Sequence, residues 1–455
     1  MKYIFFLLAS ITFLSCSKDA TTAPIADNPV DYANSKIISF SKNAGISGET
    51  ITLNGENLTS DVSKISLKFD ADVATIVSAT TTEIKFILPV SVKTIPVLKL
   101  TISNNNIQNL VVNEYSGNIG ILPVPVYNSW QAVESTLIKQ VGTNSPFIYR
   151  IQHIDSKKVY VATIDYGGSA IFRTLDGGIS WQRWTTNIGF GRNGFWVLNT
   201  DNGWAGMING VHKVQVGGNP DSAPLADIIL PTTGSDNTVY VDNDLQHGTV
   251  ITAEGKVLTT NDGLAFTEVY RSLYINPNSV YTFLEGVSFA INNNAIWAAG
   301  AVTTNGSYYR PTIIYKNSAL SDWQEYLFPV EQYYSQFPRR MVFTSVTNGF
   351  LLVHNYNGSV SGAPVNFVSS KIYQTTNGGN SWASIYETGQ SLTSITFKDA
   401  NVGWAASGNQ ILKTIDGGAT WTLDFNNNQI IRNISYKNNE VWAFSLDKFF
   451  KYRIQ

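Results

Sequence analysis

Three residue types are scarce in this chain of 455 residues, which has one cysteine, three methionines and four histidines. The single cysteine, Cys16, excludes an intrachain disulfide and any metal site built from several cysteines. The histidines, at positions 153, 212, 247 and 354, lie far apart and show no metal-ligand spacing. The sequence therefore predicts no metal and no cofactor.

Charge is scarce as well, with 14% charged residues and a formal net charge of -2. Because no basic field is available to hold a phosphate backbone, nucleic acid is not an expected partner. What the chain has instead is 43% hydrophobic and 12% aromatic residues. This composition favours many short strands joined by polar turns, and the length predicts more than one domain.

The first residues have the pattern of an export signal. Lys2 precedes an apolar run from Ile4 to Phe13 that is too short to span a bilayer. The run ends in Leu14-Ser15-Cys16, which resembles a bacterial lipoprotein signal peptide cut before its cysteine. The resemblance implies a signal peptide over residues 1–15, a lipid on Cys16, a flexible tether over 16–36 and anchorage to the outer membrane.

Two charged residues follow the expected lipidation site. Lys18-Asp19 resembles the export signal of surface lipoproteins in the Bacteroidetes group, which favours exposure at the cell surface. Periplasm-facing placement stays the alternative. The membrane is thus an expected partner through the lipid anchor.

Residues 37–117 alternate apolar and polar side chains in short runs, which predicts a small β-sandwich. Ile38-Ser39-Phe40 leads to the segment Gly48-Glu49-Thr50-Ile51-Thr52-Leu53-Asn54-Gly55, and Ile84 to Pro89 forms a later element. These residues resemble an IPT/TIG domain, an immunoglobulin-like module. The resemblance implies a spacer in a surface protein, with a binding role of its own as the alternative.

One octet, Thr-x-Asp/Asn-x-Gly-x-Ser/Thr-Trp, recurs over residues 120–455. It resembles the Asp box of bacterial neuraminidase repeats. The acidic or amide side chain is expected to accept hydrogen bonds from the turn, the glycine to supply a positive φ, and the tryptophan to pack beneath it. These residues are therefore expected to be structural. The octet positions are Asp176, Asn261, Asn377 and Asp416, with Trp181, Trp382 and Trp421.

An aromatic or apolar strand precedes each box, and seven such units can be counted. Each unit is expected to form four strands, and the segment at Trp130 is expected to complete the last unit. The predicted fold class is all-β, a small Ig-like (IPT/TIG) sandwich followed by a seven-bladed β-propeller. The units resemble the propellers of photosystem II assembly factors, which are not enzymes, and this resemblance implies the fold and a binding role.

The candidate binding face lies opposite the Asp boxes. The chain from Trp323 to Trp382 is much longer than that from Trp382 to Trp421, and the additional residues fall in loops of the fourth and fifth units. Tyrosine and arginine, which are enriched there, suit stacking on a carbohydrate or contact with a protein, and local packing of long loops is the alternative. The candidate residues are Tyr274, Tyr308, Tyr309, Arg310, Tyr333, Tyr334, Arg339, Arg340 and Tyr356.

A second hypothesis concerns the centre of the ring. Arg150 and Arg340 occupy equivalent positions at the start of the expected inner strands, with Arg192 and Arg432 nearby in their units. A ring of arginines there would favour anionic ligands, whereas ordinary solvated arginines are the alternative.

The predicted function is a non-catalytic cell-surface lipoprotein that binds a glycan or a protein partner, as an accessory subunit of an outer-membrane uptake complex. The alternative is a glycoside hydrolase, sialidase-like or xyloglucanase-like. The arginine triad and the Phe-Arg-Ile-Pro segment of sialidases have no counterpart, and the nearest approach is Tyr149-Arg150-Ile151-Gln152. The sequence offers no pair of carboxylates with an assignable acid and base role.

Overall fold

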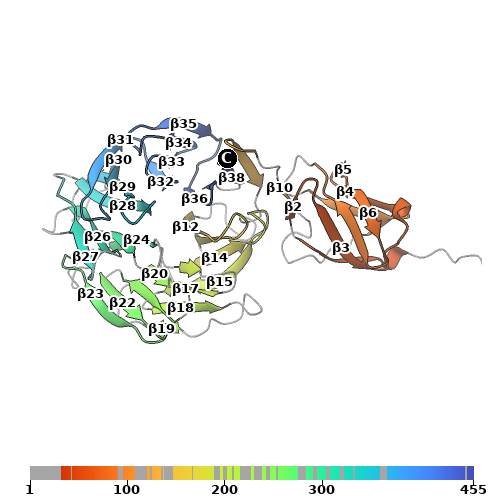
Figure 1. Ribbon diagram of the computed structural model, residues 1–455, viewed down its shortest axis with the longest axis horizontal. Helices are drawn as coiled ribbons and strands as arrows, with labels where there is room; N and C mark the ends of the chain where they lie inside the picture. Colours follow the sequence, from red (N-terminus) through yellow and green to blue (C-terminus); the bar gives the residue numbers. More distant parts are fainter. Residues whose placement is uncertain are drawn as a thin grey trace, which may run out of the picture.

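The structure, a computed structural model, is built from strands in two parts (Figure 1). It describes residues 32–42, 44–90, 96–107, 120–122, 126–134, 137, 147–165, 168–188, 195–197, 202–207, 210–215, 227–229, 238–241, 246–252, 255–274, 283–290, 295–303, 308–317, 322–331, 334–358, 366–445 and 448–455. Cys16, Tyr333 and Arg192 lie outside these residues. No described helix is long and apolar enough to cross a membrane.

The first part is a sandwich of two four-stranded sheets. Its elements are η1 (Tyr32–Asn34), β1 (Lys36–Phe40), β2 (Ala44–Ile46), β3 (Thr50–Glu56), η2 (Val62–Lys64), β4 (Ile65–Phe69), β5 (Asp72–Val73), β6 (Thr75–Ala79), β7 (Glu83–Ile87), β8 (Leu98–Ile102) and β9 (Asn105–Ile107). The sheet orders are β1-β3-β7-β6 and β5-β4-β8-β9. Alternate residues point inward, so that Leu53, Leu67 and Phe86 are fully buried in one core.

A short parallel pair connects this sandwich to the second part. β2 pairs with β10 (Gly120–Leu122), which comes after the sandwich in the chain. Ala44, in β2, is buried in a cluster that also contains Trp181 and Phe449 of the second part. The sandwich therefore touches the ring through one edge (Figure 1).

The described strands of the second part form seven antiparallel sheets of four strands each, arranged in a ring (Figure 1). The first three contain β12 (Phe147–His153), β13 (Val159–Asp165), β14 (Gly168–Thr174) and β15 (Gln182–Ile188); β16 (Phe195–Val197), β17 (Asn202–Met207), β18 (Gly210–Gln215) and β19 (Asp227–Ile229); and β20 (Thr238–Val241), β21 (Gly248–Ile251), β22 (Lys256–Thr260) and β23 (Thr267–Arg271).

The next three contain β24 (Phe283–Ala290), β25 (Ile296–Thr303), β26 (Tyr309–Lys316) and β27 (Gln324–Leu327); β28 (Tyr334–Phe343), β29 (Gly349–Asn357), β30 (Asn366–Thr375) and β31 (Ala383–Thr388); and β32 (Leu392–Phe397), β33 (Gly403–Ser407), β34 (Gln410–Thr414) and β35 (Thr422–Asn426). The seventh contains β36 (Asn433–Lys437), β37 (Glu440–Phe444), β38 (Lys448–Arg453) and β11 (Trp130–Glu134).

The first strand of each sheet lies nearest the ring axis, because these strands pack against one another from sheet to sheet. β11 pairs with β38 from Trp130↔Tyr452 to Glu134↔Lys448, so that the chain closes its ring with an early strand. The predicted all-β class is confirmed, with an Ig-like sandwich before a propeller-like ring.

The Asp-box side chains hold the turns between third and fourth strands. Asp176 accepts hydrogen bonds from the backbone N–H groups of Ile179 (3.2 Å) and Ser180 (3.0 Å). Asn377 and Asp416 accept equivalent bonds from the residue four positions further on, at 3.0 and 2.9 Å. In the sixth sheet these bonds, led by the hydroxyl of Thr420, lower the pKa of Asp416 to about 2.

The glycines and tryptophans of the boxes complete these turns. Gly178 adopts a φ of 96°, which favours glycine. Trp181 is fully buried and donates its Nε1–H to the carbonyl of Gly178 at 3.0 Å, and Trp421 does the same with Gly418. Trp382 is 9% exposed and packs in the core between the fourth and fifth sheets.

The box of the third sheet departs from the prediction, which placed Asn261 at the capping position. Asp262 instead accepts the N–H groups of Leu264 and Ala265, both at 2.8 Å, and Thr260 takes the part of the box threonine. The turn is one residue shorter here because β22 continues to Thr260 and a single glycine, Gly263, adopts a positive φ. The assignment of Asn261 is therefore corrected to Asp262.

We expect Asp176→Ala to destabilise the ring, because backbone donors in a buried turn lose a charged acceptor. The expected loss is about 2 kcal/mol in the free energy of unfolding, measured by urea denaturation. The third box supplies matched controls: Asp262→Ala lowers the midpoint, whereas Asn261→Ala leaves it unchanged. Equal effects of the last two variants would contradict the shifted register.

Candidate functional site

The face opposite the Asp boxes is raised over the fourth and fifth sheets. β25 and β26 have eight residues each and β30 has ten, whereas β33 and β34 of the sixth sheet have five. Many of the additional residues, which the sequence assigned to long loops, therefore extend paired strands. Pairing continues to Thr303↔Tyr309 and Asn357↔Asn366, because each added residue gains ladder hydrogen bonds.

Aromatic rings pack where the two extended hairpins meet. The Tyr309 ring lies 4.8 Å from that of Phe337, which lies 5.7 Å from that of Tyr356. The ring of Phe367 follows at 5.9 Å from Tyr356. Tyr309 is 8% exposed, so that its ring supports the hairpins and is not offered to a ligand.

Arg339 is fixed on the surface beside this cluster. Its Nε–H donates to Nδ1 of His354 at 3.1 Å, and one terminal N–H group donates to the hydroxyl of Tyr356 at 3.2 Å. His354 is buried and its Nε2 lies 2.8 Å from the carbonyl of Leu392. Burial, aided by the charge of Arg339, lowers the pKa of His354 to about 4, so that the ring is neutral at pH 7 with Nδ1 as acceptor.

Tyr274 follows β23 of the third sheet, and Arg310 lies on β26 of the fourth sheet. Burial lowers the pKa of Arg310, and Tyr274 is close enough to act on it in the opposite direction. Tyr274 is 38% exposed, and Leu273 beside it is 78% exposed. The carboxylate of Glu325 anchors this segment by accepting the N–H of Leu273 at 2.9 Å.

The structure thus brings together two groups of predicted residues and separates others. Tyr309, Arg339 and Tyr356 belong to one group, and Tyr274 and Arg310 to the other. Tyr308 and Tyr334 are partly buried. Arg150 lies over the ring of Phe195 at 5.4 Å, so it contacts the next sheet, and Arg340 lies on an inner strand.

A polar network on the fifth sheet and the segment before it escaped the sequence-based prediction. Lys371 of β30 donates to Glu331 at 2.5 Å and lies 3.7 Å from Glu387. Tyr373 donates to Glu331 at 3.0 Å and accepts from Gln336. Gln336 also donates to Asn355. Asn355 and Ser369 both donate to Glu387, which links the two carboxylates into one network.

The members of this network are scattered from Glu331 to Glu387, so no short sequence pattern predicts that they lie together. The only signal is the alternation of Ser369, Lys371 and Tyr373, which predicts one polar face of a strand. The two carboxylates share one ammonium group, so both are ion-pair partners of Lys371 within the fold.

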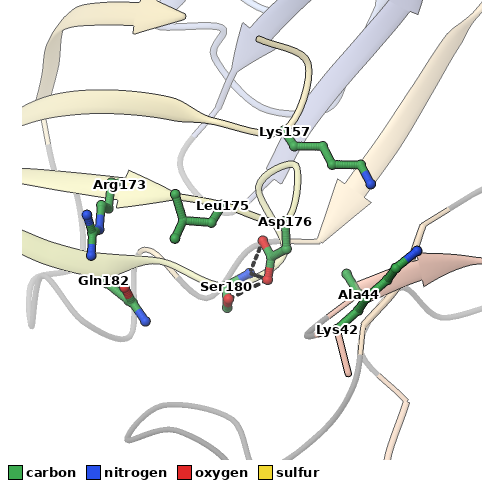
Figure 2. Close-up of a pocket in the computed structure, with 8 residues that line it drawn as sticks. All are labelled: Lys42, Ala44, Lys157, Arg173, Leu175, Asp176, Ser180 and Gln182. Carbon is green, nitrogen blue, oxygen red and sulfur yellow. Dashed lines mark hydrogen bonds between the residues drawn. The ribbon is translucent and has the colours of Figure 1, made fainter. Parts of the chain in front are cut away.

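A pocket of about 250 Å³ lies on the other side of the ring, against the sandwich (Figure 2). Lys42 and Ala44 line it from the sandwich, and Asp176 and Ser180 from the first sheet (Figure 2). Lys42 is paired with Glu49, and both oxygens of Asp176 are engaged by its own turn. The Asp176 carboxylate therefore stabilises its own turn. Across the described residues, no three His, Cys, Asp or Glu side chains are grouped to hold a metal.

We expect Lys371→Met to leave two facing carboxylates without their counter-charge. The variant is destabilised by about 1–2 kcal/mol at pH 7, a value discounted for the partial exposure of both glutamates. Thermal unfolding at pH 7 measures this, with Lys371→Arg as the charge-retaining control. Equal losses in Lys371→Met and Lys371→Arg would contradict a stabilising role of the shared positive charge.

Comparison with known proteins supports the first part of this description. Residues 35–118 match the IPT/TIG domain family, close to the boundaries 37–117 expected from the sequence. No curated protein matches the chain. The sandwich is therefore an IPT/TIG domain.

Solved structures show similar arrangements at low identity. YCF48 bound to a D1 peptide is 15% identical, covers 73% of this chain and 100% of its own, and has a TM-score of 0.46. An auxiliary nutrient binding protein from Bacteroides thetaiotaomicron VPI-5482 is 12% identical, covers 92% of this chain and 98% of its own, and has a TM-score of 0.37. BamB from Moraxella catarrhalis is 9% identical, covers 67% of this chain and 96% of its own, and has a TM-score of 0.37. Likeness at this level carries no conclusion about ligands.

Proposed function

We propose that this chain is a non-catalytic lipoprotein of the outer membrane, anchored through Cys16 and exposed at the cell surface. Its IPT/TIG domain acts as a spacer. The ring binds a glycan or a protein partner through the face opposite the Asp boxes, as an accessory subunit of an uptake complex. No cofactor takes part.

One observation carries the proposal, namely that this face presents apolar and cationic groups on extended, anchored strands. Leu273, Tyr274 and Val330 are 78%, 38% and 51% exposed. Arg339 is exposed and oriented by His354 and Tyr356. Exposed Tyr and Arg side chains held in fixed geometry are typical of binding surfaces, since little entropy is lost on contact.

The glycoside hydrolase alternative finds less support. Two carboxylates on this face, Glu331 and Glu387, are both engaged by Lys371. Glu325 accepts hydrogen bonds from four other donors, including Ser272 and Thr312. A hydrolase needs one protonated carboxyl and one free carboxylate across a cleft. These carboxylates instead stabilise the extended strands.

Binding is tested by glycan array and by affinity capture from outer-membrane extracts, using the purified protein. We expect Tyr274→Ala and Arg339→Ala to weaken binding of the captured ligand by about tenfold or more. Tyr127, which is 55% exposed at the Asp-box end of β11, provides the matched control Tyr127→Ala, with no expected change. Capture of a glycan or of a protein decides the ligand class. Turnover of a sialoside or β-glucan would overturn the non-catalytic proposal.

Anchorage is tested separately through the cysteine. We expect Cys16→Ala to move the protein from the membrane fraction to the soluble fraction, since the lipid would have no attachment atom. Incorporation of labelled palmitate is expected in the wild type and not in the variant. Incorporation of labelled palmitate into Cys16→Ala would contradict lipid attachment at this cysteine. Failure of added protease to cleave the wild-type protein on intact cells would contradict surface exposure.

A further inference from the structure

The inner strands place a set of polar residues at one level around the ring axis. Each second-strand aromatic pairs with an inner residue, as in Gln152↔Tyr160, Val342↔Phe350, Thr396↔Trp404 and Ser435↔Trp442. Two residues earlier stand Arg150, Arg340, Ser394 and Asn433, respectively. Arg150, Arg340 and Ser394 each follow a backbone irregularity in their strand, a feature that redirects side chains.

Arg340 lacks a counter-charge. Its Nε is buried with no hydrogen-bond partner, and its guanidinium makes no ion pair in the part of the chain that the structure describes. The side chain nevertheless keeps some accessible surface, while burial lowers its pKa to about 10. An Nε–H that is buried without an acceptor forfeits its hydrogen bond to water, so this arrangement costs stability unless another molecule supplies an acceptor.

The charge of Arg340 reaches across the ring. It lowers the pKa of His153 on β12, although two sheets lie between the fifth sheet and the first. The pKa of His153 is about 3, first because of burial and then because of the charges of Lys451, Lys437 and Arg340. Three cations therefore act on this one imidazole, which stays neutral at pH 7.

A second arginine occurs near the start of the seventh sheet. Arg432 precedes β36, and its buried Nε also has no partner among the described residues. Ser394 lies on the sixth sheet, between the sheets of Arg340 and Arg432. It donates to the amide oxygen of Asn433, the residue after Arg432, at 3.1 Å. These neighbours are hydroxyl and amide groups, so they supply no carboxylate that would neutralise Arg340 or Arg432.

We propose that the ring axis holds a binding site for a small oxyanion, a phosphate or carboxylate group, with Arg340 as its principal contact. A planar guanidinium with unused donors matches such oxygens in bidentate fashion. The oxyanion would provide the acceptor that the protein does not. This site is separate from the face with Tyr274 and Arg339, and it does not depend on what that face binds.

Arg340→Met tests the site, with calorimetric titration of the purified protein by inorganic phosphate and, separately, by succinate at constant ionic strength. The wild type is expected to bind at least one of them, and the tighter one identifies phosphate or carboxylate chemistry. Arg340→Met is expected to reduce that affinity by about tenfold or more. Arg271→Met, on outer strand β23 and paired with Glu268, is the matched control with unchanged affinity.

The ligand-free proteins give an independent readout. Without added oxyanion, Arg340→Met is expected to unfold at a higher temperature than the wild type, because it lacks the uncompensated charge. Should the variant fail to fold, phenylglyoxal labelling of wild-type Arg340 replaces it, with protection by the bound oxyanion expected. The proposal is overturned if neither anion binds the wild type, if Arg340→Met binds as tightly, or if no anion protects Arg340.

Discussion

Pairing of β11 with β38 is the contact on which the rest of the structure depends. An early strand completes the seventh sheet, so that both ends of the ring segment are held in one ladder. Trp130 reinforces this closure by donating its indole N–H to Asp424 of the sixth sheet at 2.7 Å and by packing on Tyr452. Without this strand the seventh sheet would leave an open edge, and the inner strands would lose their fixed spacing around the axis.

The two sides of the closed ring differ in which groups they bury and which they expose. On one side, Asp-box turns are saturated by their own hydrogen bonds, and the IPT/TIG domain contacts the ring through Ala44. On the other side, the fourth and fifth sheets extend beyond their neighbours and carry exposed groups such as Tyr274. On an inner strand, the buried Nε of Arg340 has no hydrogen-bond partner among the described residues. The box turns thus have their hydrogen bonds satisfied, whereas the opposite side leaves apolar and polar groups exposed.

The sequence predicts the fold well because its signals are local. The Asp-box octets, the alternating strands of the sandwich and the closing strand at Trp130 each require only a few neighbouring residues, and all three occur in the structure. The register at Asn261 was wrong because Thr259 and Thr260 both fit the box, and only the length of β22 decides between them. The equivalence of Arg150 and Arg340 was visible in spacing alone, and both follow the same strand irregularity.

The candidate site was predicted less completely, because its contacts join residues far apart in the chain. No spacing foretells that Lys371 lies between Glu331 and Glu387, or that Tyr309 is buried while Tyr274 remains exposed. Loop length indicated that the added residues belong to the fourth and fifth sheets but not that they extend strands. Such features depend on how neighbouring sheets meet, which is a property of tertiary packing and not of local pattern.

We propose that the Asp-box side of the ring stabilises the fold and that the opposite side binds a partner or glycan. The most direct test is photo-crosslinking in living cells, with a photoreactive amino acid placed at position 274 in one strain and at position 127 in another. The account predicts cross-links to a partner or glycan at position 274 and none at position 127. Cross-links at position 127 alone would contradict it, because the Asp-box side would then be the binding side.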